Sequence, residues 1–302
     1  MRISNQQLFD QAVNQMTRQQ AKIADLQTQI GEGKQLIRPS DNADKSAVIQ
    51  RLNTAASRQE VYEATLDSVS NRLDAEESII LSSSDILQRM KELAILSNDG
   101  SNGEFDRSAV AIEVSTLREQ LLSQANQQDL NGNYIFSGSN VKSAAFAADN
   151  SGVINYVGNQ QRISVDISEH RQIEVNRPGS DVFKGVDRGG SDVGFFQVID
   201  DFVTALDTNN NSKIELALSE IEVLANEMTG AITNLGARMG VVESHRATLA
   251  EVKLRYETLL SEEETLDYAT AITELSAEIL SLEGAQASFA QISQLSLFNY
   301  IK

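Results

Sequence analysis

Two histidines and a few short polar motifs are the residues of this 302-residue chain that could perform chemistry. His170 and His245 could act as bases or metal ligands, but neither has a second ligand at helical spacing. We expect His245 to take a solvated or interhelical position. The stretch from Asp207 to Asn211 resembles the start of a calcium loop. Ser212 and Leu218, however, occupy the positions where such a loop needs a glycine and a glutamate.

Two further motifs also fail on particular residues. Gly31-Glu-Gly33-Lys34 resembles part of a phosphate-binding loop, but Thr28 stands where that motif needs its first glycine. Three consecutive glutamates, 262 to 264, point in different directions on a helix, so we interpret them as a solvated face. The chain has no cysteine, which excludes thiolate nucleophiles and cysteine-ligated metals. We therefore expect no catalytic, cofactor or metal site, and no enzyme.

Charge and composition exclude two classes of partner. The 43 acidic and 25 basic side chains give a formal net charge of -18, which disfavours nucleic acid and anionic membranes. No stretch approaches the roughly 18 apolar residues that a membrane span needs, and the N-terminus has no apolar signal region. If the chain leaves the cytoplasm, we expect a route without a cleaved signal peptide. The only two prolines permit long helices almost everywhere.

Both ends of the chain repeat a large apolar residue at every seventh position. Such spacing places one narrow apolar line along a helix, and that line requires another helix as its partner. Residues 1 to 38 carry a net charge of +2 and residues 264 to 302 carry -4, so the two ends should attract each other. We call these apolar residues the terminal seam and predict that they form an assembly interface: Phe9, Met16, Ile23, Ile30, Leu275, Ile279, Leu282, Phe289, Ile292 and Leu295.

The middle of the chain predicts more helices and one small β region. Seven-residue spacing also runs from about residue 42 to 96 and from 214 to 256, and a shorter pattern predicts a helix that ends near residue 130. Alternating polar and apolar residues predict strands at 162 to 167 and 172 to 176, with 153 to 157 as a partner strand. The fold class is therefore mainly α, with long heptad-patterned helices in a rod-like bundle, a small β insertion, and paired N- and C-terminal helices.

Three domains follow from these patterns. Residues 1 to 43 and 264 to 302 should form a terminal paired-helix assembly domain. Residues 44 to 133 and 186 to 263 should form the helical bundle, and residues 134 to 185 a small β domain. Turns that contain glycine bound this β domain at both ends, so we expect it to be a separable module.

Both ends of the chain resemble the flagellin family. The resemblance rests on residues 26 to 43, which combine a heptad helix, a Gly31-Glu-Gly33-Lys34 break and a Pro39-Ser-Asp turn. It also rests on Leu266-Asp-Tyr-Ala-Thr-Ala-Ile and the segments 287 to 293 and 295 to 298. Within the family, the stretches 131 to 138 and 175 to 183 are similar to the hook-filament junction group. Flagellin itself is the alternative, and a secreted coiled-coil effector or translocator is a more distant one.

The resemblance implies a structural role and a set of partners. A family member of this kind would self-associate into a ring beneath the filament and contact a neighbouring hook-associated protein and flagellin. It would be secreted through the flagellar type III channel, after a cytoplasmic export chaperone had bound its C-terminal region. Its terminal helices would form the innermost tube.

Overall fold

The structure is a computed structural model that describes residues 2–98 and 104–298, with side chains described for residues 7, 9–98 and 106–291. The chain divides into two compact units. Unit 1 consists of Met1–Arg58 and Glu251–Lys302, and unit 2 of Gln59–Ala250. We describe each unit by itself.

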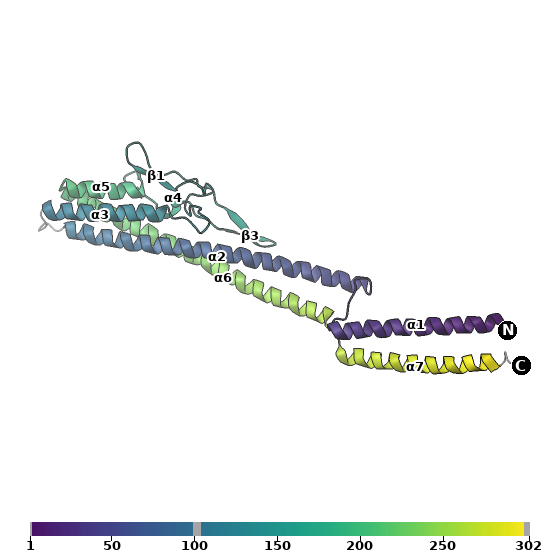
Figure 1. Cartoon of the computed structure of the whole chain (residues 1–302). Helices are drawn as coiled ribbons and strands as arrows, with labels where there is room; N and C mark the ends of the chain where they lie inside the picture. The colour runs from purple at the N-terminus through teal and green to yellow at the C-terminus, as the bar shows by residue number, and fades with distance from the viewer. Residues whose placement is uncertain (1, 99–103, 299–302) are drawn as a thin grey trace. The chain divides into compact units, whose positions relative to one another are not determined.

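Unit 1 is built around its two terminal helices. α1 (Arg2–Glu32) and α7 (Tyr268–Phe298) lie side by side and run in opposite directions, so the start of α1 and the end of α7 lie at the same end of the pair (Figure 1). The unit also contains the beginning of α2 (Ala43–Asn98) and the end of α6 (Asn211–Glu264). The expected pairing of the N- and C-terminal helices is confirmed.

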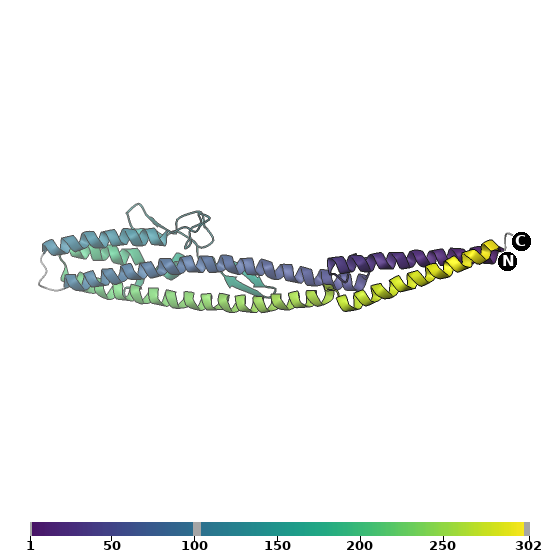
Figure 2. The same ribbon diagram turned by 60° about the horizontal axis from the view of Figure 1, so that its bottom comes forward.

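Unit 2 holds most of the buried core. Within it, α2 and α6 run antiparallel, because Asp67 pairs with Arg246 at 2.6 Å while Lys91, further along α2, pairs with the earlier residue Glu222 at 2.9 Å (Figure 2). The shorter helices α3 (Glu104–Ala125) and α5 (Phe195–Asp207) pack against each other. Heptad residues of the long helices, such as Leu66, Leu73 and Ile221, are fully buried, as their spacing predicts.

Three small antiparallel strand pairs occupy the region between α3 and α5. β1 (Phe146–Ala148) pairs with β2 (Ile154–Tyr156), and β3 (Ser164–Ser168) pairs with β4 (Arg171–Glu174). After the single turn of α4 (Gly179–Val182), β5 (Val186–Asp187) pairs with β6 (Asp192–Val193). The fold is mainly helical with small strand pairs, so the predicted fold class is confirmed.

Some local predictions need correction. The strand at 153 to 157 exists as β2, but its partner is β1 and not the 162 to 176 hairpin, because Asp149 closes a tight turn between β1 and β2. The third hairpin, β5 with β6, was not predicted. The helix expected to end near residue 130 ends at Ala125.

Phenylalanine rings join the β insertion to the helices. Phe146 and Phe183 of the insertion lie 5.3 Å, between ring centroids, from Phe196 and Phe195 of α5 respectively. Phe136 packs edge-on against Phe183 at 5.4 Å. These rings belong to the same buried cluster as the heptad residues of α2 and α6. The insertion and the helical bundle therefore share one hydrophobic core.

Candidate assembly interface in the paired terminal helices

Six residues of the terminal seam lie where α1 and α7 pack against each other. Met16, Ile23 and Ile30 on α1, and Leu275, Leu282 and Phe289 on α7, are each partly buried. Phe9 and Ile279 remain exposed, by 46% and 39%. Ile292 and Leu295 lie outside the residues whose side chains the structure describes.

Three contacts set the register of α1 on α7. The rings of Phe9 and Phe289 lie 4.6 Å apart, Gln19 donates to the hydroxyl of Ser281 at 2.7 Å, and Lys22 pairs with Glu278 at 2.6 Å. The pairing with Glu278 raises the pKa of Lys22. Exposed ion pairs of this kind contribute little to stability, because water screens the attraction between the charges. The predicted attraction between a basic and an acidic end therefore takes the form of specific ion pairs, Lys22 with Glu278 and Lys34 with Glu264 at 3.6 Å.

A second apolar line runs along α7 outside the helix pair. Ile272, Ile279 and Leu280 recur at seven- and eight-residue steps and are exposed by 52%, 39% and 70%. On α1, Val13 is also exposed. Of these three residues, only Ile279 was predicted to belong to the interface, although the seven-residue step from Ile272 to Ile279 also indicates this line. These residues leave uncovered apolar surface on the α1–α7 pair.

The connectors between the helices of unit 1 bind each other through the backbone. Gln35 donates its N–H to the carbonyl of Glu264 at 2.8 Å, and Leu266 donates to the carbonyl of Gly33 at 3.1 Å. Gly33 has φ +68°, and a Cβ there would lie 2.7 Å from the hydroxyl of Tyr268. A glycine is required at this position for both reasons.

Polar side chains cap the helices on either side of these connectors. Asn42 accepts from the backbone N–H of Lys45 at 3.0 Å and caps α2. Asp267 caps α7 by accepting from the N–H of Ala269 and from the hydroxyl and N–H of Thr270. The bonds from Thr270 hold the pKa of Asp267 below its usual value.

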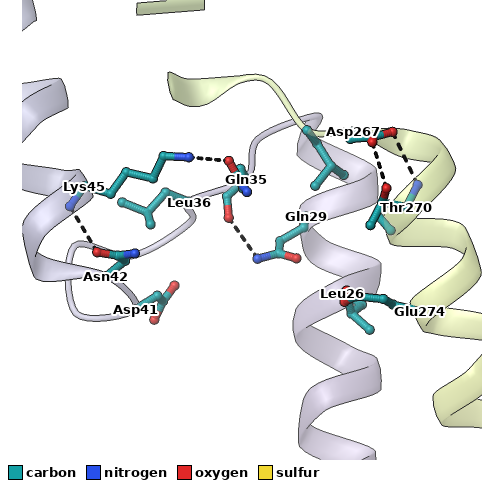
Figure 3. Close-up of a pocket in the computed structure, with 12 residues that line it drawn as sticks. Leu26, Gln29, Gln35, Leu36, Asp41, Asn42, Lys45, Asp267, Thr270 and Glu274 are labelled. Carbon is teal, nitrogen blue, oxygen red and sulfur yellow. Dashed lines mark hydrogen bonds between the residues drawn. The ribbon is translucent and has the colours of Figure 1, made fainter. Parts of the chain in front are cut away.

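A cavity of about 320 Å³ opens beside the connectors (Figure 3). Its apolar lining comes from Leu26, Leu36, Leu266 and Ala271, and all of these except Leu36 are buried. Its polar lining includes the side chains of Asp41, Lys45, Asp267 and Glu274. The cavity thus combines an apolar floor with more negative than positive charge.

The two motifs that suggested the junction group meet in unit 2. Gly179 donates its N–H to the carbonyl of Phe136 at 2.7 Å. The amide oxygen of Asn176, which is fully buried, accepts from the N–H of Ile163 at 2.5 Å. Tyr156 donates its hydroxyl to the same carbonyl of Phe136 at 3.1 Å. Both motifs therefore hold separate segments of the β insertion together.

Buried charges also fasten the insertion. Glu76 of α2 is almost fully buried and lies 3.3 Å from Arg238 of α6 and 3.9 Å from Arg177 of the insertion. Arg238 also donates to the carbonyl of Glu174 at 2.8 Å. Burial raises the pKa of Glu76 against the attraction of these guanidinium groups. The cluster connects α2, α6 and the insertion.

The two histidines and the candidate calcium loop do not form a catalytic or metal site among the described residues. The histidines lie on different elements, and the loop residues are bound by another side chain. His170 follows β3, whereas His245 lies on α6. The side-chain oxygens of Asn209 and Asn211 accept hydrogen bonds from the guanidinium of Arg107, which takes the place that a calcium ion would need. Within residues 2–98 and 104–298, no group of three metal-ligating side chains comes together. No helix in this part of the chain is long and apolar enough to cross a membrane.

Comparison with known proteins shows which proteins this chain resembles. The family described as bacterial flagellin N-terminal helical region matches residues 3–141. Flagellar hook-associated protein 3 of Escherichia coli (strain K12) is 24% identical over 320 residues, which cover 100% of both chains. The chain is thus similar to the flagellin family over residues 3–141 and to hook-associated protein 3 over its whole length.

Other members of the flagellin family match less of the chain. The flagellin of Listeria innocua serovar 6a is 24% identical over 271 residues, which cover 89% of this chain and 86% of that protein. The crystal structure of FlgL from Xanthomonas campestris superposes with a TM-score of 0.62 at 20% identity, over 70% of this chain and 99% of that one. That similarity shows a shared fold. The predicted resemblance to the flagellin family is confirmed.

Proposed function

We propose that this chain is a structural subunit of the bacterial flagellum and joins the hook to the filament. The observation that carries this proposal is the end-to-end correspondence with flagellar hook-associated protein 3, in which both chains are covered completely. The correspondence includes both terminal helices, where the uncovered apolar surface lies.

Self-association explains why that surface is uncovered. Apolar side chains gathered on one face of a protein mark an interaction site, and Ile272, Ile279 and Leu280 form such a line on α7. Neighbouring subunits in a ring would cover this line and the ends of the terminal seam. A neighbouring hook-associated protein and flagellin would then contact the ring on its two sides.

The C-terminal region also has the properties of a chaperone target before assembly. α7 carries only three charged side chains, Glu274, Glu278 and Glu283, over its whole length. A cytoplasmic export chaperone that covered this helix would keep its apolar surface from aggregating. The chain would then be secreted through the flagellar export channel and would pair α1 with α7 at its destination.

Flagellin remains the second candidate, because the Listeria flagellin has the same identity over a shorter part of the chain. Complete coverage by hook-associated protein 3 favours the junction role. We infer no catalytic activity for either role, since Arg107 occupies the candidate calcium loop and Glu76 is bound by arginines.

Immunogold labelling of isolated flagella tests the proposal and separates the two candidates. A junction subunit should be labelled in one narrow band between hook and filament. A filament subunit would be labelled along the whole filament. In a deletion strain, we expect hooks without filaments and flagellin released into the medium. Label along the filament, or normal filaments in the deletion strain, would contradict the junction role.

A further inference from the structure

We propose that the cavity beside the connectors of unit 1 receives the side chain of Arg38 from a neighbouring copy of this chain, whose guanidinium then pairs with Glu274. This inference rests on the proposed self-association and names one contact within it. It follows from the lining of the cavity, from the charges left without partners, and from the geometry of a closed ring.

The lining of the cavity suits a long side chain with a cationic end. Leu26, Leu266 and Ala271 are buried and form its apolar floor, and three carboxylates against one ammonium group give it an acidic rim. The volume of about 320 Å³ equals roughly ten water molecules at about 30 Å³ each, which is enough for one arginine. Arginine buries its methylene groups on apolar surface while its guanidinium binds a carboxylate.

Glu274 is the carboxylate of this rim that is available. Asp267 is engaged in capping α7, and Asp41 accepts from the backbone N–H of Arg38 at 2.9 Å. Glu274 forms no hydrogen bond or ion pair among the described residues and interacts only electrostatically with Lys22, which is bound to Glu278. Figure 3 shows Glu274 beside Leu26 at the cavity. A cation that entered here would find one uncommitted carboxylate.

Arg38 is the matching cation. Three basic residues lie in or beside the connector that follows α1. Lys34 pairs with Glu264 at 3.6 Å, and Lys45 pairs with Glu263 at 3.5 Å and donates to Gln35 at 2.5 Å. Arg38 is exposed, and its guanidinium has no partner among the described residues.

The geometry of a closed ring favours the neighbouring subunit as the source of the arginine that enters the cavity. A closed ring requires a heterologous interface, in which two different surfaces of one subunit meet, and rotation alone keeps equivalent residues at the same level. Arg38 belongs to the same connector as Leu36 and Asp41, which line the cavity, but does not line it itself. Arg38 of one subunit and the cavity of the next can therefore face each other without any shift along the axis.

Disulfide trapping tests the contact directly, because the natural chain has no cysteine. Isolated hook-filament structures carrying R38C together with E274C should give a ladder of dimers, trimers and larger species after oxidation on a non-reducing gel. The matched control is R51C with E274C, since Arg51 is another exposed basic residue of unit 1 and should give no ladder. A crosslink confined to the monomer, or no crosslink in structures that contain the protein, would overturn the inference.

Charge reversal supplies a second test that does not depend on oxidation. R38E alone and E274R alone should each reduce the fraction of cells with filaments by about tenfold, and the double variant should recover to within about twofold of the natural chain. Circular dichroism of the purified variants checks their folding. A double variant no better than the worse single one, or single variants without effect, would overturn the contact. Immunogold label away from the junction in the natural chain would instead overturn the proposed function.

Discussion

The rings of Phe9 and Phe289 pack in a tilted arrangement at a centroid distance of 4.6 Å, although almost the whole sequence separates them. Their contact lies near the free end of the α1–α7 pair, and Phe9 is still 46% exposed there. The two rings are thus only partly covered within one chain, and each can gain further burial from a neighbour.

The first prediction concerns Leu282 and Phe289, which are partly buried on α7. Burying a large apolar side chain stabilises an interface by about 1.5 to 3 kcal/mol. A polar substitution at such a position removes this stabilisation from every subunit of a ring. We expect Leu282→Gln with Phe289→Gln to abolish filament attachment and to change the monomer's Tm by no more than about two degrees.

Electron microscopy of cells measures filament attachment, and thermal unfolding of the purified protein measures Tm. Detection of the variant in culture supernatant checks that it is still exported. Ile112→Gln, an exposed site on α3, is the control. A large fall in Tm would place both residues in the monomer's own core.

The second prediction concerns resistance to protease. Among the described side chains of unit 1, only Leu26, Leu266 and Ala271 are buried, whereas unit 2 has an extended core. The ends of the free chain should therefore open and be cleaved first. Limited proteolysis with mass spectrometry should yield a stable fragment of about residues 45 to 260. Ends that survive as long as the middle would refute the idea that they need assembly partners.

The third prediction concerns Phe183, whose ring contacts Phe136, Phe146 and Phe195. Removing a buried phenylalanine ring costs about 3 to 5 kcal/mol. We expect Phe183→Ala to lower the free energy of unfolding by that amount in urea denaturation. Val157→Ala, at an exposed position beside β2, should have little effect. If Phe183→Ala unfolds like the natural chain, the insertion is a separable module after all.

The fourth prediction concerns pH. Burial and the nearby charge of Arg171 lower the pKa of His245. The folded chain then holds the proton less tightly than the unfolded chain, so stability should be lost as pH falls below about 6.5. Thermal unfolding at pH 7.5 and 5.5 should show a smaller loss for His245→Gln than for the natural chain.

Proton NMR tests the cause of that shift. The chain has only two histidines, so His245→Gln assigns both imidazole signals. Arg171→Gln should raise the pKa of His245 because it removes the second of the two causes. An unchanged titration of His245 in Arg171→Gln would show that burial alone lowers its pKa.

The sequence predicts the long helices well because each repeats one simple spacing over many turns. Val114 and Leu121, for example, lie seven residues apart on α3, and both are fully buried. Pro39 and Gly33 also mark the connector between α1 and α2 correctly, whereas Gly31 lies in the last turn of α1. Such local rules need no knowledge of distant residues.

The β insertion and the cavity are less predictable because they depend on contacts between distant segments. β1 has the sequence Phe-Ala-Ala, which has no alternating pattern, so nothing indicated that it would pair with β2. The phenylalanines of the shared core lie between residues 136 and 202 at irregular spacing. Leu26, Leu36 and Leu266 come from three separate segments, and only the folded connectors bring them to one cavity.

The pairing of α1 with α7 also determines the order in which the two units can fold. Unit 2 lies within Gln59–Ala250, so it can fold once that stretch of chain is free. The contact between Gln19 and Ser281 closes a loop of more than 260 residues and cannot form before nearly the whole chain has emerged. A chain that is synthesised or threaded through a channel from one end therefore completes its assembly surface last, and arrives with that surface still unformed.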